Sequence, residues 1–287
     1  MSDELAGKMV LITGGNTGIG KETAIALAGM GAQVVFTARN PQKGRDALVE
    51  IRERSGSTNV EVMALDLASL ASVREFATAF AAAHDRLDVL VNNAGSVLGK
   101  RSETEDGYET TFQVNHLGHF LLTRLLQPQL SAGAPARVIN VSSDLHKRAR
   151  HGLDFDDLQS EHGYRGVRVY GRSKLANILF TRELARRWDG TGVTANSLHP
   201  GVVSSGLGGD GDLGRMASLA KPLVRPFILS PQQGAQTSIY LASSPDVEGI
   251  TGAYWVKSAP TSPAPAAQDD AAARRLWEVS DELAGIA

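Results

Sequence analysis

The chain has 287 residues, of which 42% are hydrophobic and 21% charged, so it can bury a sizeable core and is not a disordered polypeptide. Its 29 basic and 31 acidic residues give a formal net charge of −2, which excludes the strongly basic surface of a nucleic-acid-binding protein. The absence of cysteine excludes disulfides, thiolate metal sites and cysteine nucleophiles, and it favours the reducing cytoplasm as the location.

The first residues are expected to enter the fold directly. Residues 1–8 contain acidic side chains and lead into a strand, which predicts neither a signal peptide nor a membrane anchor. No apolar run approaches the roughly 20 residues that a membrane-spanning helix needs. We therefore expect a soluble protein without a membrane anchor.

Short apolar runs alternate with longer segments of helical periodicity. The predicted strands are residues 9–13, 34–37, 60–65, 89–91, 138–141, 193–198 and 253–256, and the predicted helices include residues 20–30, 70–83, 108–126 and 169–188. The strands are almost wholly apolar and do not alternate with polar residues, as expected for a parallel sheet with helices on both faces. The fold class is therefore predicted as α/β: a single doubly wound (Rossmann) sheet of about seven mostly parallel strands.

We expect one domain over residues 1–258. Within it, residues 204–230 are Gly-rich and then apolar at irregular helical spacing, which we interpret as a mobile lid. Residues 259–287 are interpreted as a Pro/Ala-rich linker and a C-terminal helical tail with amphipathic character from residue 269 to 283.

A glycine-rich turn follows the first predicted strand and precedes a helix. Gly14, Gly18 and Gly20 would let the backbone approach a pyrophosphate at the helix N-terminus, and the intervening Asn16, Thr17 and Ile19 complete the candidate site. The alternative is an ordinary strand-to-helix turn. A literal G-x-G-x-x-G occurs instead at residues 206–211, but no strand-to-helix unit begins there, so we interpret it as a hinge.

The residue after the second strand indicates the cofactor. Enzymes that bind NAD carry an acidic residue in this region, whereas this chain has Arg39, with Lys43 close by. A guanidinium pairs well with a ribose 2′-phosphate, so we predict NADP(H). The alternative is that Arg39 is a solvated surface residue.

Tyr170 and Lys174 stand one helical turn apart. Of the five tyrosines, only Tyr170 has a lysine four positions later. An ammonium on the same helix face is expected to lower the phenol pKa from about 10 toward the operating pH, as a proton-transfer residue requires.

These motifs, with Asn92-Asn93-Ala94-Gly95 and Val141-Ser142-Ser143, resemble the short-chain dehydrogenase/reductase family from about residue 8 to 256. The resemblance implies that Ser143 orients the substrate oxygen, Tyr170 transfers the proton, Lys174 holds the nicotinamide ribose, and Asn115 anchors a proton-relay water. Ser142 competes with Ser143, and Asn115 could instead be a helix cap. The resemblance also assigns cofactor contacts to Asp66, Leu67, Asn92, Ala94, Gly95, Pro200, Gly201, Val203 and Ser205.

The segments at residues 18–23, 115–122 and 173–187 look like the retinol dehydrogenase branch of that family. This implies hydride transfer between a carbonyl and an alcohol on a lipophilic, retinoid-like substrate, and a homo-oligomer (dimer or tetramer) formed through the helices at 108–126 and 169–188. Protochlorophyllide reductases depend on active-site cysteine, which this chain lacks. A noncatalytic NADP(H)-binding sensor or scaffold is the alternative. His116 and His119 share a helix face without a clear third ligand, so no metal is expected.

Overall fold

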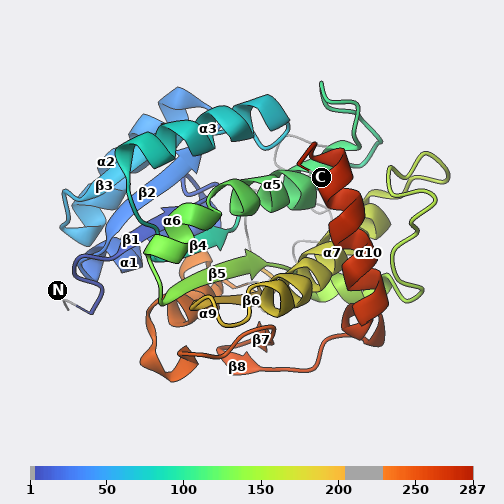
Figure 1. Ribbon diagram of the computed structural model, residues 1–287. Coiled ribbons are helices and arrows are strands. Elements are labelled where there is room, and N and C mark those ends of the chain that lie inside the picture. The colour runs from blue at the N-terminus through green and yellow to red at the C-terminus, as the bar shows by residue number, and fades with distance from the viewer. Residues whose placement is uncertain (1–3, 204–228, 287) are drawn as a thin grey trace.

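The computed structural model describes residues 4–203 and 229–286. Its sheet has eight strands in the order β3-β2-β1-β4-β5-β6-β7-β8, and all neighbours are parallel except β7 and β8 (Figure 1). The strands are β1 (Met9–Ile12), β2 (Gln33–Ala38), β3 (Val60–Ala64), β4 (Val89–Asn92), β5 (Ala136–Val141), β6 (Val193–His199), β7 (Tyr254–Val256) and β8 (Ala259–Pro260). The predicted α/β class and seven strands are confirmed, and β8 adds a short antiparallel edge.

Helices connect the strands and also close the chain. The α-helices are α1 (Gly18–Gly29), α2 (Pro41–Ser55), α3 (Leu70–Ala83), α4 (Thr110–Phe112), α5 (Gly118–Leu125), α6 (Gln127–Ala132), α7 (Gly166–Arg187), α9 (Pro231–Ser243) and α10 (Asp270–Leu283). The π-helix η1 (Gln113–Leu117) joins α4 to α5, and the 3-10 helices are η2 (Asp144–Arg148), η4 (Pro245–Val247) and η5 (Pro265–Gln268). The expected lid lies almost wholly outside the described residues.

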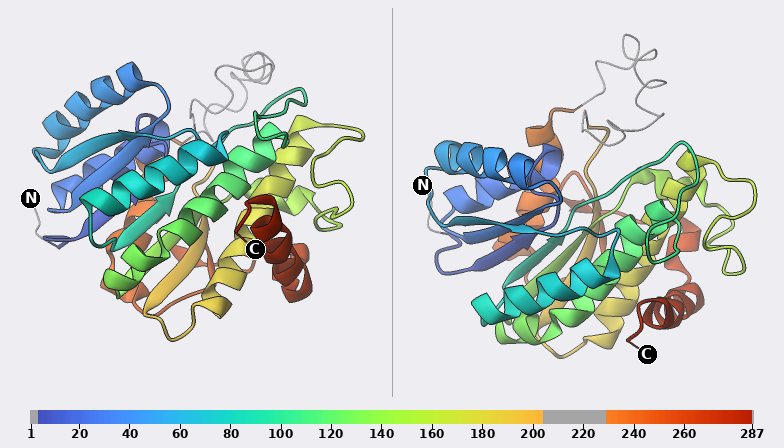
Figure 2. Two further views of the ribbon diagram at one scale, coloured as in Figure 1. Left: turned by 45° about the horizontal axis from the view of Figure 1, so that its top comes forward. Right: turned by 90° about the horizontal axis from the view of Figure 1, so that it is seen from above.

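The helices form a layer on each face of the sheet (Figures 1 and 2). On one face, α3, α5 and α7 bury residues such as Phe80, Phe120 and Leu184 against the sheet. On the other face, α1, α2 and α9 bury residues such as Leu27 and Ile51. Because both faces are covered, the strands are apolar on both sides, which explains the unbroken apolar runs in the sequence.

Polar residues set the ends of individual helices. The Asn40 side chain accepts from the Lys43 amide at the start of α2, and Gly56 ends that helix with a left-handed φ of 69°. Ser230 and Gln233 form a reciprocal capping box at the start of α9. These caps satisfy amides that a helix leaves free at its first turn.

The C-terminal segment packs onto the sheet-covering helices. In α10, the Trp277 side chain is 4% exposed, and the guanidinium carbons of Arg124 and Arg187 lie 4.9 and 4.7 Å from the centre of its ring. Arg124 also pairs with Asp281. Helix α10 therefore contributes to the core that α5 and α7 bury.

Over residues 4–203 and 229–286, none of the helices combines the length and hydropathy required to cross a bilayer.

Candidate active site

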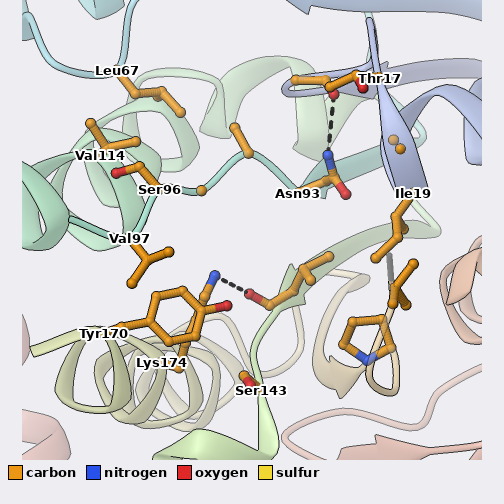
Figure 3. Close-up of a pocket in the computed structure, with 18 of the residues that line it drawn as sticks. Thr17, Ile19, Leu67, Asn93, Ser96, Val97, Val114, Ser143, Tyr170 and Lys174 are labelled. Atoms are coloured by element: carbon orange, nitrogen blue, oxygen red, sulfur yellow. Dashed lines mark hydrogen bonds between the residues drawn. The ribbon is translucent and has the colours of Figure 1, made fainter. Parts of the chain in front are cut away.

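The site lies at the point in the sheet where the order of the strands reverses, between β1 and β4. β1 pairs with β2 on one side and with β4 on the other, so the connections that follow β1 and β4 diverge and leave a crevice at their carboxyl ends. A cavity of about 1640 Å³ opens there, between the glycine turn, the end of β5 and the first turns of α7 (Figure 3). The cavity is large enough for a dinucleotide and a second small molecule.

Two glycines of the turn adopt backbone angles that favour glycine, and a third lies against neighbouring atoms. Gly14 and Gly18 have φ of 65° and 56°. A Cβ on Gly20 would lie 2.5 Å from Asn93 Nδ2 and 2.6 Å from the Gly14 carbonyl oxygen. Thr17 precedes α1 without a side-chain cap, so this helix N-terminus offers free amides. Asn16, Thr17, Ile19 and the three glycines all line the cavity.

The loop after β4 holds this turn in place. Asn93 donates from its side chain to the Thr13 carbonyl at 2.8 Å and lines the cavity. Asn92, the predicted contact, points the other way: it is 2% exposed and donates to Thr123 and Asn140, so it supports β4 and β5 from inside. Consecutive strand residues point to opposite faces, and this alternation gives the cavity position to Asn93.

The predicted adenine end of the cavity also comes together. Arg39 and Lys43 lie exposed at its edge, after β2. Asp66 and Leu67 line it after β3, and the Asp66 carboxylate accepts from the Ala68 amide at 3.0 Å. The Arg39 guanidinium is therefore placed where a cation could meet an anionic group in the cavity.

Tyr170, Lys174 and Ser143 lie together on the opposite wall (Figure 3). The Lys174 ammonium is 5.5 Å from the centre of the Tyr170 ring and donates to the Val141 carbonyl at 2.9 Å. Burial raises the pKa of Tyr170 to about 12, and an interaction with the Ser143 hydroxyl opposes this rise. Burial also lowers the pKa of Lys174 to about 8.

The expected lowering of the Tyr170 pKa by Lys174 is therefore not found. Removing the phenol from water disfavours its anion, and this effect is larger than any stabilisation from its surroundings. With a pKa of about 8, Lys174 remains mostly protonated at neutral pH, so it places an ammonium beside the Tyr170 ring.

The two serines at the end of β5 point in different directions. The Ser142 hydroxyl is buried and donates to the Lys174 carbonyl at 2.7 Å, which ties β5 to α7. The Ser143 hydroxyl accepts from the Leu145 amide at 3.2 Å and interacts with Tyr170. Ser143 is therefore the better placed of the two to contact a substrate oxygen.

Asn115 lies in the π-helix η1, behind the cavity wall. Its side chain accepts from the Ser96 amide at 2.7 Å and donates to the Ser96 carbonyl and the Ser173 hydroxyl, both at 2.9 Å. It does not line the cavity. The side chain instead joins the loop after β4 to α7, and it is not a helix cap.

Other predicted residues line the cavity, and one cannot be placed. Ala94 and Gly95 follow β4, and Pro200, Gly201 and Val203 follow β6. A Cβ on Gly95 would lie 3.4 Å from Lys174 Nζ, so a larger residue there would crowd the ammonium. Ser205 lies outside the described residues, as does the hinge interpreted at 206–211.

Sequence reasoning missed a group of apolar side chains that line the cavity, here called the apolar wall, of which Val97 lies beside Tyr170 (Figure 3). Its residues come from five separate segments of the chain, namely Val97, Leu98, Val114, Leu145, Val167 and Val202. Lys147, Arg148 and Arg150 also line the cavity and are exposed. No local motif marks these residues, because only the tertiary fold brings them together.

His116 in η1 and His119 in α5 are both buried. Among the residues that the structure describes, there is no group of three side chains that could hold a metal ion. Burial lowers the pKa of both His116 and His119 to about 3, so both rings are neutral.

Comparison with known proteins identifies the family. The sequence model of the short chain dehydrogenase family matches residues 8–154. Retinol dehydrogenase 12 of Homo sapiens is 48% identical over 286 residues, covering 99% of this chain and 88% of that protein. Retinol dehydrogenase 14 of Homo sapiens is 46% identical over 297 residues, covering 98% and 87%.

Solved structures agree with this assignment. An uncharacterized protein from Mycobacterium paratuberculosis aligns with a TM-score of 0.78 and 33% identity, over 98% of this chain and 94% of that one. The NADP active-site complex of Pseudomonas aeruginosa RhlG aligns with a TM-score of 0.71 and 28% identity, over 89% and 96%. The chain therefore belongs to the short-chain dehydrogenase/reductase family and is an oxidoreductase related to the retinol dehydrogenases.

Proposed function

We propose that the protein interconverts a lipophilic aldehyde or ketone and the corresponding alcohol, using NADP(H), with Tyr170 as the proton-transfer residue. The observation that carries this proposal is the placement of Tyr170, Lys174 and Ser143 on one wall of a single cavity, facing the glycine turn. The apolar wall supports a hydrophobic substrate. The names of the retinol dehydrogenase relatives support a retinoid-like one.

The residues present fit a nicotinamide dinucleotide. The glycine turn borders the cavity beside the free amides at the start of α1. Its path depends on glycine, because a Cβ on Gly20 would enter space that Asn93 and Gly14 already fill. Arg39 supports a ribose 2′-phosphate, and hence NADP(H) rather than NAD(H). When bound, the cofactor supplies or accepts a hydride at the substrate carbon.

The chain's own residues would handle the substrate oxygen. In reduction, Ser143 donates to the carbonyl oxygen and the Tyr170 phenol delivers its proton to that oxygen. The raised pKa keeps Tyr170 protonated at neutral pH, which suits a proton donor. The Lys174 ammonium stabilises the phenolate that remains. In oxidation, the same groups act in reverse.

Tyr170→Phe tests this proposal. The purified protein should oxidise NADPH in the presence of lipophilic aldehydes, which is measured as a loss of nicotinamide absorbance. The kcat of the variant should be lower by at least about 100-fold, the usual contribution of a positioned proton donor. Tyr240→Phe is the matched control, because that ring packs against Trp255 away from the cavity. A fully active Tyr170→Phe variant would contradict the assignment.

The alternative is a sensor or scaffold that binds NADP(H) without chemistry. Tight NADPH binding with no turnover across neutral and anionic aldehydes and ketones would favour it over the enzyme. The complete set of Ser143, Tyr170 and Lys174 in one cavity supports the enzyme, since a binding protein does not need the proton donor.

Location and assembly complete the proposal. We place the protein in the cytoplasm, supported by the lack of cysteine. We also propose that the protein forms a homo-oligomer. Because α10 packs along α7, an interface through α7 must use the part of its surface that α10 leaves free. Light scattering on the purified protein gives the molar mass that decides between monomer, dimer and tetramer.

A further inference from the structure

We propose that His119 is a positioning residue, whose neutral ring fixes the loop after β4 and the helix that carries Asn115 relative to the cofactor cavity. The inference deepens the proposed function, because the elements it joins form one wall of the cavity proposed to bind NADP(H). His119 does not line the cavity and touches no reacting atom.

The ring connects two segments that are more than 100 residues apart. His119 lies in α5 and is 2% exposed. Its Nε2 is 2.8 Å from the Thr13 hydroxyl, at the end of β1. Its Nδ1 is 3.2 Å from the backbone carbonyl of Asn115, in the π-helix η1.

The surroundings of Thr13 determine which nitrogen carries the proton. The Thr13 oxygen already accepts from the amides of Asn93 and Ala94, at 2.9 and 3.0 Å. A hydroxyl has one proton to donate, and His119 Nε2 at 2.8 Å is a nearer acceptor than the Val91 carbonyl at 3.4 Å. Nε2 is therefore the acceptor, and Nδ1–H donates to the Asn115 carbonyl.

This arrangement forms a continuous chain of hydrogen bonds. It runs from the amides of Asn93 and Ala94 through the Thr13 hydroxyl and the His119 ring to the carbonyl of Asn115. Every member is buried or half-buried, so each bond restricts its partner more firmly than an exposed bond would. Asn93 in turn holds the glycine turn, and the Asn115 side chain holds Ser96.

A positive charge on the ring would oppose this arrangement. Protonated Nε2 could no longer accept from Thr13, and the ammonium of Lys174 already repels a second cation in this region. Burial holds the pKa of His119 at about 3, so the neutral form persists over the working pH range. The residue is thus a fixed connector and not a pH switch.

Two variants at this position separate the two ends of the ring. His119→Phe keeps the shape and removes both bonds, and we expect the NADPH dissociation constant to rise about tenfold, as a lost buried hydrogen bond does. In His119→Gln, the amide oxygen can still accept from Thr13, so we expect part of the affinity to return. Binding is measured by the fluorescence of bound NADPH.

His116→Phe is the matched control. His116 lies three residues earlier on the same helix path, is fully buried, and bonds to Ser280 of α10 at 2.9 Å and not to the loops of the cavity. We expect it to lose stability like His119→Phe but to bind NADPH like the wild type. Equal NADPH affinity in the two histidine variants would overturn the inference.

A double-mutant cycle tests the connection without any cofactor. If Thr13 and His119 act through one bond, Thr13→Val combined with His119→Phe should destabilise the protein less than the two single effects added together, measured by urea unfolding. Additive effects would overturn the inference. Wild-type protein that does not bind NADPH would refute the proposed function, and the unfolding cycle would still decide the role of His119.

Discussion

Replacing Gly20 with alanine adds one methyl group at the point where the glycine turn meets the loop after β4. The added Cβ would lie 2.5 Å from Asn93 Nδ2 and 2.6 Å from the Gly14 carbonyl oxygen. Ordinary carbon contacts are about 3.5 Å or longer, so one of these groups must move by roughly 1 Å. Asn93 is bonded to Thr13, and Gly14 is backbone, so neither can yield without shifting the turn itself.

Overpacking of this kind costs about 1–3 kcal/mol. The strain falls on the turn proposed to hold the pyrophosphate, so we expect NADPH affinity to fall by about tenfold or more, at 1.4 kcal/mol per factor of ten. A better helix propensity for alanine offsets only about 0.5–1 kcal/mol of the stability loss. Titration of NADPH fluorescence and thermal unfolding measure the two effects separately.

Gly29→Ala provides the control within the same helix. A Cβ there would lie 3.7 Å from the Ser55 carbonyl oxygen, which is an ordinary contact. Gly29 is also not one of the described glycines that have a left-handed φ. We expect this variant to bind NADPH like the wild type and to be no less stable. If Gly20→Ala behaves in the same way as Gly29→Ala, the turn is not the phosphate site.

Three further predictions concern the charge of Arg39, the pH dependence of stability and the C-terminal helix α10. Arg39→Leu should weaken NADPH binding by about 10- to 100-fold and leave NADH binding nearly unchanged, since a hydrogen bond to a charged group contributes about 1.5–3 kcal/mol. In urea unfolding without cofactor, the free energy of unfolding of the wild-type protein should include a contribution that rises between about pH 8 and 10.5, and Lys174→Met should abolish it. A second contribution should fall between about pH 10 and 12, and Tyr170→Phe should abolish that one. Burial lowers the pKa of Lys174 from 10.5 to about 8, so between these pH values only the unfolded chain keeps the lysine proton and stability rises with pH. Burial raises the pKa of Tyr170 from 10.0 to about 12, so between these pH values only the folded chain keeps the phenol proton and stability falls with pH. Trp277→Ala should cost about 3–5 kcal/mol in unfolding free energy, because it empties a buried aromatic site.

The sheet could be predicted because its strands are buried on both faces. Continuous apolar runs such as those of β1, β4 and β5 carry a signal that needs no knowledge of the partners. The eighth strand carries no such signal, because Ala259–Pro260 is two residues long and its pairing depends on where β7 ends. The C-terminal helix was expected from its periodicity, but its partners were not.

The position of the site was predictable, whereas its electrostatics were not. The spacing of Tyr170 and Lys174 identifies the helix face, since four residues make about one turn. The direction of the Tyr170 pKa shift depends on how completely the fold removes the phenol from water, and this is decided by residues from distant segments. The sequence also did not show that Asn92 turns away from the cavity, whereas Asn93, after the end of β4, lines it.

The segment interpreted as a linker contributes to the site through His146. The Ala264 amide donates to His146 Nε2 at 3.1 Å, so the ring proton must lie on Nδ1, which donates to the Ser143 carbonyl at 2.7 Å. The backbone beside the candidate catalytic serine is therefore held by a residue more than 100 positions away. Such a contact leaves no local pattern, because its two ends have ordinary sequences and only the packing of η5 brings them together.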